Sequence, residues 1–267
     1  MFLKNYFLKE KLKQNSYFIW NSQKKNIQTI KQFKPLDLTL IIGVDSQKEI
    51  LSKNTINFAE GNFTNNALLW GARGNGKSSL IKSVFNKILI SHKNLKLIQL
   101  NKNDIFDIEY IYSILANYNN YRFIIFIDDL SFEKIDSDYK IIKSTLDGSI
   151  QNQPTNILLY VSSNRRHLMP RDMIDNERSS AIHTDESVEE KISLSDRFGL
   201  WIGFHKLSQI DYLKIIETYC QHFGINYNEE INKKAIQWSL QRGNRTGRTA
   251  WQFILNTASD QNLKIKI

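Results

Sequence analysis

Residues 66–80 read Asn-Ala-Leu-Leu-Trp-Gly-Ala-Arg-Gly-Asn-Gly-Lys-Ser-Ser-Leu, and this stretch decides the fold. The apolar run at 67–70 predicts a buried strand, and residues 71–78 follow it without a gap and fit the pattern G-x-x-x-x-G-K-[ST]. A glycine-rich turn matches this pattern by chance in about one chain in a hundred of this length, and less often directly after a strand. The stretch therefore predicts a strand, a phosphate-binding loop and a helix.

The residue types of this loop each have a physical role. Glycines allow positive φ and let the backbone turn its amide hydrogens inward, so that the loop and the following helix N-terminus form a concave anion site. Lys77 supplies a positive charge for the β and γ phosphates of a nucleotide, and Ser78 supplies a hydroxyl for Mg2+. The expected nucleotide contacts are Gly71, Ala72, Arg73, Gly74, Asn75, Gly76, Lys77, Ser78 and Ser79.

Composition excludes several classes of protein. At 267 residues and 41% apolar content, the chain is long enough for one substantial core and a small satellite. The single cysteine, Cys220, forms no internal disulfide, and no Cys/His cluster has metal-ligand spacing. No apolar run approaches the roughly 20 residues of a membrane span, and the first 34 residues lack the apolar segment of a signal peptide. We expect a cytoplasmic protein with no membrane insertion.

The positive charge is concentrated at the start of the chain. The formal net charge is +9, from 36 basic and 27 acidic residues. Eight lysines lie within the first 34 residues, against the single acid Glu10. A solvated helix face is the usual explanation of such a segment. Attraction to nucleic acid or to another anionic surface is the alternative, and it stays open.

The remaining pattern predicts an α/β fold in which strands alternate with helices. Residues 1–34 mix lysines with aromatic residues and predict one or two helices before the break at Pro35. Apolar runs predict strands at 67–70, 95–100, 121–127, 156–162 and 200–204, with a helix at 45–60 before them and helices at 77–89, 104–117 and 137–146 between them. Residues 171–190 carry many charges without a period and predict a mobile loop. This alternation predicts a five-stranded parallel sheet with helices on both faces.

The last part of the chain predicts a small all-helical unit. Three helical patterns follow Ser208, at about 209–223, 229–241 and 247–259, and Gly224 and Gly243 separate them. We therefore divide the chain into a basic aromatic segment at 1–34, a nucleotide-binding core at 35–206 and a helical unit at 207–267.

Polar residues at the ends of the predicted strands are candidate catalytic groups. Asp128 and Asp129 end the third strand and Asn164 follows the fourth, so these residues should meet the phosphate loop at one edge of the sheet. Asp128 is placed to hold Mg2+ and Asp129 to polarise an attacking water, whereas a turn or a helix cap is the alternative explanation of the pair. Asn164 could hydrogen-bond the γ phosphate or the water.

Arginines near the fifth strand and the last helix complete the candidate set. Arg197 lies in Ser-Leu-Ser-Asp-Arg-Phe-Gly before the strand at 200–204, and Arg245 and Arg248 lie in Gly-Asn-Arg-Thr-Gly-Arg, which opens the last helix. A surface ion pair is the default explanation of any one of them.

The ordered set of motifs resembles the AAA-plus ATPases. Several segments resemble more closely a bacterial AAA-plus family catalogued only as a domain of unknown function, namely residues 66–79, 128–133 with Tyr139-Lys140, 162–167 and 189–201. The resemblance implies a P-loop NTPase with ATP and Mg2+ as cofactors and with the helical unit as a lid. It also implies roles for single residues: Ile42 and Gly43 beside the adenine, Asn164 as sensor 1, Arg197 as an arginine finger acting in trans, and Arg248 as sensor 2 with Arg245 in reserve.

One departure from the wider AAA-plus pattern concerns the second acid. That family usually has Glu where this chain has Asp129, and the shorter side chain is expected to slow hydrolysis, although replication-initiator-like relatives also have Asp-Asp. Glu133, four residues later, is a candidate substitute.

Two functions of different kinds follow from these observations. The first is a homo-oligomeric ATPase, with Arg197 acting in trans, that turns ATP hydrolysis into the remodelling of an unknown protein client. The alternative is an ATP-dependent switch or loader that binds DNA or a DNA-bound protein and hydrolyses little. A small-molecule kinase is a weaker third reading, because the helical C-terminal unit and Arg197 argue against it and no acceptor site is visible. No aromatic loop of the kind used by threading unfoldases follows the second strand, so protein translocation is not supported.

Overall fold

The computed structural model describes residues 2–132, 137–147, 153–168 and 194–265 of the chain. Glu133 and the expected loop at 171–190 lie outside the described residues. The described helices are α1 (Phe2–Gln14), α2 (Asp45–Ala59), α3 (Lys77–Leu89), α4 (Ile108–Leu115), α5 (Ser137–Asp147), α8 (Gln209–Phe223), α9 (Glu229–Gln241) and α10 (Gly247–Asp260), with short 3-10 helices η1 (Leu38–Leu40) and η2 (Lys102–Asp107). The strands are β1 (Tyr17–Asn21), β2 (Asn26–Thr29), β3 (Ala67–Gly71), β4 (Leu95–Leu100), β5 (Arg122–Ile127), β6 (Ile157–Ser163) and β7 (Leu200–Phe204).

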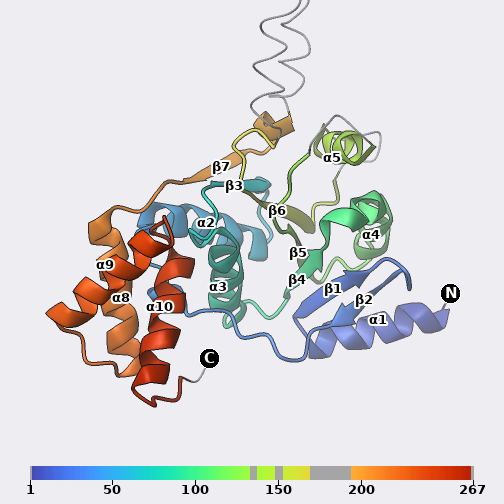
Figure 1. Ribbon diagram of the computed structural model, residues 1–267. Helices are drawn as coiled ribbons and strands as arrows, with labels where there is room; N and C mark the ends of the chain where they lie inside the picture. The colour runs from blue at the N-terminus through green and yellow to red at the C-terminus, as the bar shows by residue number, and fades with distance from the viewer. Residues whose placement is uncertain (1, 133–136, 148–152, 169–193, 266–267) are drawn as a thin grey trace, which may run out of the picture.

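A single sheet runs through the centre of the molecule (Figure 1). The strand order is β2-β1-β4-β5-β6-β3-β7, and every pair except β1–β2 is parallel. The five strands expected from the apolar runs are confirmed as β3 to β7. The prediction of a five-stranded sheet is wrong in number, because the sheet among the described residues has seven strands.

The two additional strands come from the segment predicted to be helical. Helix α1 is present, but residues 17–29 form a β-hairpin whose first strand pairs with β4, with Phe18 opposite Ile98. Burial alternates along β1, where Phe18 and Trp20 are buried and their neighbours are half-buried. That period of two is a strand signal, which the frequent lysines of the segment obscured. The division of the chain at residue 34 stays a prediction.

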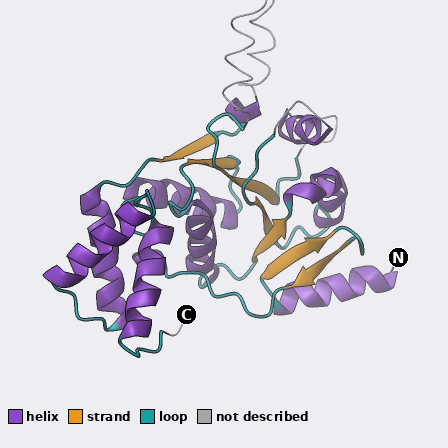
Figure 2. Cartoon of the chain, in the orientation of Figure 1, coloured by secondary structure: helices purple, strands orange, loops and turns teal. Residues whose placement is uncertain are grey.

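Helices cover both faces of the sheet because successive residues of each strand point to opposite sides (Figure 2). In β5, Ile124 and Phe126 belong to the core under α2 and α3, whereas Phe123, Ile125 and Ile127 belong to the core under α1, α4 and α5. All five side chains are fully buried. A strand buried on both faces explains the continuous apolar run in the sequence.

Helices α8, α9 and α10 form a third core of their own, and we call them the lid. Their shared apolar cluster includes Tyr212, Ile216 and Ile254, and η1 joins it through Leu40. A capping box between Ser208 and Asp211 starts α8. Residues 205–208 connect β7 to α8 and are called the linker. In the part of the chain that the structure describes, no helix has the length and apolar character needed to cross a membrane.

Candidate functional site

The phosphate loop connects β3 to α3 at the carboxyl edge of the sheet, where the sequence places it. Gly71 has φ 131° and Gly74 has φ 84°. A Cβ on Gly71 would lie 2.0 Å from the carbonyl oxygen of Phe204, so only glycine allows the loop to begin beside β7. The pairing of β3 with β7 therefore requires a glycine at the first position of the loop.

Lys77 is held inside the loop by three oxygen atoms. Its Nζ donates to the carbonyl oxygens of Gly71 at 2.8 Å and Ala72 at 2.9 Å, and to Asn164 Oδ1 at 2.9 Å. Burial lowers the pKa of this amine from 10.5 to about 8, against the opposing effect of Asp129 and Asp128. The amine is thus fixed in position, and a bound anion would stabilise its charged form.

Ser78, Asp128 and Ser162 form a chain of hydrogen bonds next to the loop. The hydroxyls of Ser78 and Ser162 both donate to Asp128 Oδ1 at 2.5 Å. Ser162 Oγ also accepts the backbone N–H of Asp129 at 2.9 Å. A hydroxyl and a carboxylate supply oxygen ligands of the kind that Mg2+ prefers. Ser78 and Asp128 could therefore hold Mg2+ together with phosphate oxygens.

Ser162 is a site residue that the sequence reasoning missed. In the parallel pair β5–β6, Ile127 lies opposite Val161, so the next residues, Asp128 and Ser162, are neighbours. A polar residue that ends an apolar strand next to a strand ending in Asp-Asp was the available signal. It needed the strand order, which local sequence does not contain.

Asp129 lies beside Asn164 in an uncommon backbone conformation. Its φ is +55°, and its Oδ1 accepts a hydrogen bond from Asn164 Nδ2 at 2.5 Å. Arg73 Nη2 lies 3.5 Å from its Oδ2. The amide of Asn164 thus connects Asp129 to Lys77. Asp and Asn tolerate positive φ better than most residues because their short polar side chains can hydrogen-bond locally.

These groups line one cavity of about 540 Å³ between the core and the lid. Its polar wall includes Arg73, Gly74, Asn75, Gly76, Lys77, Ser78, Ser79, Asp128, Asp129, Ser162, Asn164 and Arg248. Its apolar wall is formed by Leu36, Leu40, Ile41, Ile42, Leu207, Ile215, Tyr219 and Trp251. A polar end beside an apolar end matches the phosphates and the base of a nucleotide. Apart from Ile42, the sequence reasoning identified none of the apolar wall, which is assembled from the segment before α2, the linker and the lid.

Three expected nucleotide contacts, Gly43, Gly71 and Ala72, are not among the residues that line this cavity. Gly43 has φ +78° and faces Leu207 and Asp211, so it shapes the chain rather than the wall. Gly71 and Ala72 contribute to the site indirectly, because their carbonyl oxygens accept hydrogen bonds from Lys77 Nζ.

The lid is attached directly to the phosphate loop. The backbone N–H of Arg248 donates to the carbonyl oxygen of Gly74 at 3.1 Å. A Cβ on Gly74 would lie 3.0 Å from Thr246 Oγ1, so the two segments are in close contact. Arg248 lines the nucleotide-sized cavity and Arg245 does not. The structure therefore brings Arg248 rather than Arg245 to this cavity, and the role of Arg248 as a lid sensor stays a prediction.

The structure does not bring Arg197 to this cavity. Arg197 precedes β7, whose first residue Leu200 lies opposite Ala67, whereas the phosphate loop begins four residues later at Gly71. Four residues of strand span roughly 13 Å. Arg197 therefore lies toward the amino edge of the sheet, away from the phosphate loop of its own chain.

Among the described residues, no group of three or more His, Cys, Asp or Glu could hold a metal.

Comparisons with known proteins agree with this fold. The family described as "Protein of unknown function (DUF815)" matches residues 13–261. Comparison with curated proteins returned no match. A variant of Thermotoga maritima RuvB is 17% identical with a TM-score of 0.55, and the alignment covers 87% of this chain and 74% of that one.

Two further solved structures have a similar fold. The Aeropyrum pernix Orc1 protein, in complex with DNA, is 14% identical with a TM-score of 0.57, over 84% of this chain and 62% of that one. A chain of the Escherichia coli MS115-1 HORMA:CdnC:Trip13 complex is 11% identical with a TM-score of 0.52, over 82% of this chain and 90% of that one. At these identities the likeness concerns the fold, which is that of an AAA-plus P-loop ATPase.

Proposed function

We propose a function for this chain, which belongs to the family described as "Protein of unknown function (DUF815)", from the site just described. The chain is an ATPase that binds ATP with Mg2+ between its phosphate loop and its lid. One observation carries the proposal: side chains from four separate segments line one cavity that has a polar and an apolar end. These side chains are Lys77, Ser78, Asp128, Asp129, Asn164 and Arg248.

Each of these residues has its own role in the proposed hydrolysis of ATP. Asp129 orients the attacking water and accepts its proton, and Asn164 holds the carboxylate in place from one side. Lys77 and Arg248 stabilise the negative charge that develops on the transferred phosphoryl group. Mg2+, held through Ser78 and Asp128, would supply further charge stabilisation at the β and γ phosphates.

The lid gives hydrolysis a mechanical consequence. Since Arg248 contacts the phosphate loop through its backbone and lines the cavity through its side chain, a change at the γ phosphate reaches α10 directly. We propose that this movement remodels a client that is still to be identified. The Trip13 structure, in which the similar chain belongs to a complex with HORMA and CdnC, makes a protein client a reasonable first choice.

The active unit in this proposal is a homo-oligomer. Arg197 lies toward the amino edge of the sheet, away from its own phosphate loop. A neighbouring copy that presents Arg197 at the mouth of the cavity would complete the site with the positive charge that phosphoryl transfer requires.

Steady-state phosphate release tests the enzymatic claim. Wild-type protein with Mg2+ and ATP should release phosphate, and Lys77→Ala should not. Lys87→Ala, which changes an exposed lysine on the same helix, is the matched control and should retain wild-type turnover. Wild-type turnover in Lys77→Ala would overturn the proposal.

A DNA-binding switch with little turnover is the second candidate. It is supported by exposed lysines on the N-terminal segment, such as Lys9 and Lys24, and by the similar fold of Orc1 in complex with DNA. Because β1 belongs to the central sheet, deleting residues 1–34 would remove two strands, so point substitutions are the appropriate test. Lys9→Gln with Lys24→Gln should weaken DNA association and its salt dependence, whereas Lys53→Gln with Lys87→Gln should not. Equal loss in both double variants would count against it.

A further inference from the structure

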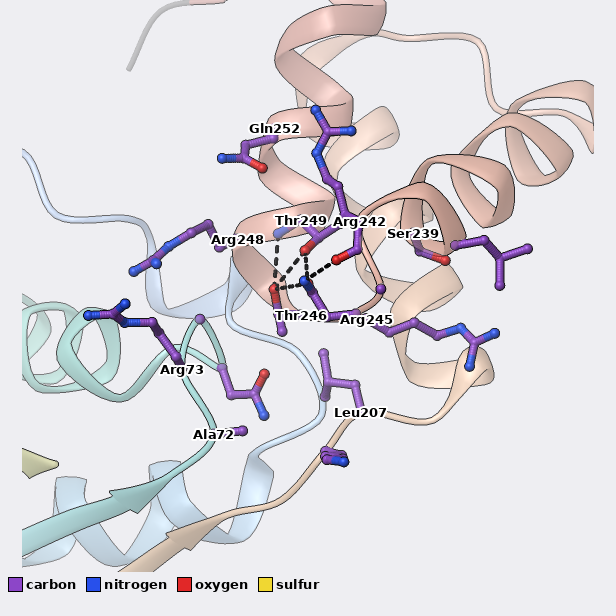
Figure 3. A pocket seen from close by; sticks show the side chains of 16 residues that line it. Ala72, Arg73, Leu207, Ser239, Arg242, Arg245, Thr246, Arg248, Thr249 and Gln252 are labelled. Carbon is purple, nitrogen blue, oxygen red and sulfur yellow. Dashed lines mark hydrogen bonds between the residues drawn. The ribbon is translucent and has the colours of Figure 1, made fainter. Parts of the chain in front are cut away.

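A second and larger cavity lies beside the nucleotide-sized one. Its volume is about 780 Å³, and it is bounded by the phosphate loop, the linker and the segment from α9 to α10 (Figure 3). The two cavities share a wall that includes Gly74 and Arg248. Figure 3 shows Arg73 and Arg248 on one side of the view and Arg245 on the other. Core and lid therefore both contribute side chains to this second space.

All of the charged residues that line the second cavity are positive. Five of its lining residues are basic and none is acidic; they are Arg73, Lys206, Arg242, Arg245 and Arg248. The whole chain contains 27 acids against 36 basic residues, so a wall of this size without one acid is a local departure from composition. Positive groups brought together without acids repel one another and raise the local potential.

Most of the basic residues that line the second cavity have no acidic partner among the described residues. Within the described ranges, Lys206, Arg242 and Arg245 form no ion pair with an acid. The Arg242 guanidinium stacks over the Trp238 ring, 3.5 Å from its centre. Arg245 Nε is buried and has no hydrogen-bond partner among the described residues. Arg242 is thus held by ring stacking, and Lys206, Arg242 and Arg245 have no acidic partner among the described residues, whereas Arg73 lies 3.5 Å from Asp129 Oδ2.

A buried polar side chain from the phosphate loop faces the same space. Asn75 lines the cavity, is only 7% exposed, and donates from Nδ2 to the carbonyl oxygen of His205 at 2.7 Å. Its Oδ1 is buried and has no partner in the described part of the chain. The donor nitrogen of Asn75 is thus already used within the protein, so the basic residues rather than Asn75 supply the donors that this wall offers to an anion.

We propose that the second cavity binds a polyanion that carries two or more phosphate groups. Guanidinium groups match phosphate oxygens with paired hydrogen bonds, and several of them at once favour a multiply charged ligand over a single carboxylate. A free polyphosphate and a nucleic-acid backbone share this chemistry. Because Arg73 and Lys206 come from the core side and Arg242 and Arg245 from the lid, a bound polyanion fixes the lid against the core.

Binding of tripolyphosphate, measured by calorimetry, tests the site. The experiment uses full-length protein saturated with ADP, and in parallel Lys77→Ala protein, in which the phosphate loop has lost its lysine. The double variant Lys206→Gln/Arg245→Gln should bind tripolyphosphate roughly tenfold more weakly or worse, because two charge-assisted contacts are lost. Lys214→Gln/Lys233→Gln, which removes the same charge from exposed lid positions, should bind as the parent protein does.

The outcomes separate this site from the nucleotide site. Unchanged ADP affinity in the Lys206→Gln/Arg245→Gln variant, together with weaker tripolyphosphate binding, supports the proposal. The single variant Lys206→Gln should show part of the loss in tripolyphosphate affinity. Because Lys206 is exposed, this variant controls for misfolding of the double variant. Equal tripolyphosphate affinity in the cavity and control variants, or no binding to the parent protein, overturns it. If the wild-type protein does not bind ADP, that result contradicts the proposed function rather than the second site.

A single-stranded oligonucleotide identifies the source of the phosphates. If the ligand is a nucleic-acid backbone, the cavity variant should lose oligonucleotide affinity, and its salt slope should fall by about one to two relative to the control variant. If only tripolyphosphate binding changes, a free polyphosphate is the ligand.

Discussion

Asn164 accepts a hydrogen bond from Lys77, with 2.9 Å between Oδ1 and Nζ. The same amide donates to Asp129 from Nδ2 at 2.5 Å. One side chain directly after β6 thus orients both the cation of the phosphate loop and the candidate base. Its removal should disturb catalysis more than binding, because the phosphate loop itself stays intact.

We expect Asn164→Ala to lower the turnover number for ATP by roughly 10- to 100-fold, the range for loss of one positioned polar group. ADP affinity should change little. Asn164→Asp keeps the acceptor for Lys77 and loses the donor to Asp129, so it should also be slow. Comparing phosphate release with ADP affinity checks this, and turnover at the wild-type rate in both variants would contradict it.

The φ of +55° at Asp129 offers a reason for the acid found there. Most AAA-plus proteins have Glu at this position, but Asp tolerates the left-handed region better. We expect Asp129→Glu to lower the free energy of unfolding by about 1 kcal/mol without raising turnover. Asp129→Asn should fold as stably as the wild type and lose roughly 100-fold in phosphate release. Thermal unfolding and kinetics of both variants measure the two effects separately; a faster and equally stable Glu variant would refute the explanation.

The lowered pKa of Lys77 makes nucleotide affinity depend on pH. In the empty site the pKa is about 8, against an ordinary value of 10.5, so the amine loses its proton as pH rises above about 8. Bound phosphate favours the charged form and raises the pKa again, so binding takes up a proton in this range. ADP affinity should therefore fall as pH rises from 8 toward 10.5, by at most about tenfold per pH unit.

Calorimetry at pH 8.5 in two buffers of different ionisation heat measures this proton uptake. At pH 7 the uptake attributable to Lys77 should be small. Lys77→Arg does not titrate in this range and is the control. Equal affinity at pH 7.5 and pH 9.5 in the wild type would show that the amine keeps its proton in the empty site.

The trans role of Arg197 predicts complementation between two inactive variants. Lys77→Ala can offer its Arg197 to a neighbour, and Arg197→Ala can bind ATP, so mixed oligomers should release phosphate although neither variant does so alone. Mixing Arg197→Ala with the double variant Lys77→Ala/Arg197→Ala should restore nothing. A lack of recovery in mixtures that co-elute as one oligomer would reject the trans arrangement.

The N-terminal hairpin is attached to the core by a buried carboxylate. Asp107 is 4% exposed and accepts from Trp20 Nε1 at 2.8 Å and from Lys25 Nζ at 2.5 Å. Asp107→Ala leaves the buried indole N–H unpaired, which should lower the free energy of unfolding by about 1–3 kcal/mol. Glu109→Ala, at an exposed position two residues later, should cost far less. Denaturant unfolding followed by tryptophan fluorescence measures both variants, and equal stability of the two would argue against this attachment.

Local sequence predicts the elements of the core closely. The runs at 95–100 and 200–204 coincide with β4 and β7, and the phosphate loop follows β3 as expected. Each signal lies within a few neighbouring residues, because an apolar run or a glycine pattern encodes its own burial or backbone conformation. The hairpin at 17–29 escaped detection because its apolar residues become a strand only by pairing with β4.

The amino-acid sequence by itself determined that this chain has a P-loop core followed by helices, and it identified Lys77, Asp128 and Asn164 as candidates. Only the tertiary structure decided that Ser162 bridges the two aspartates, that Arg248 rather than Arg245 lines the nucleotide-sized cavity, and that basic residues from core and lid surround a second one. The physical reason is that these relationships depend on which distant segments meet. Strand order and lid packing set those meetings, and both are properties of the folded chain as a whole.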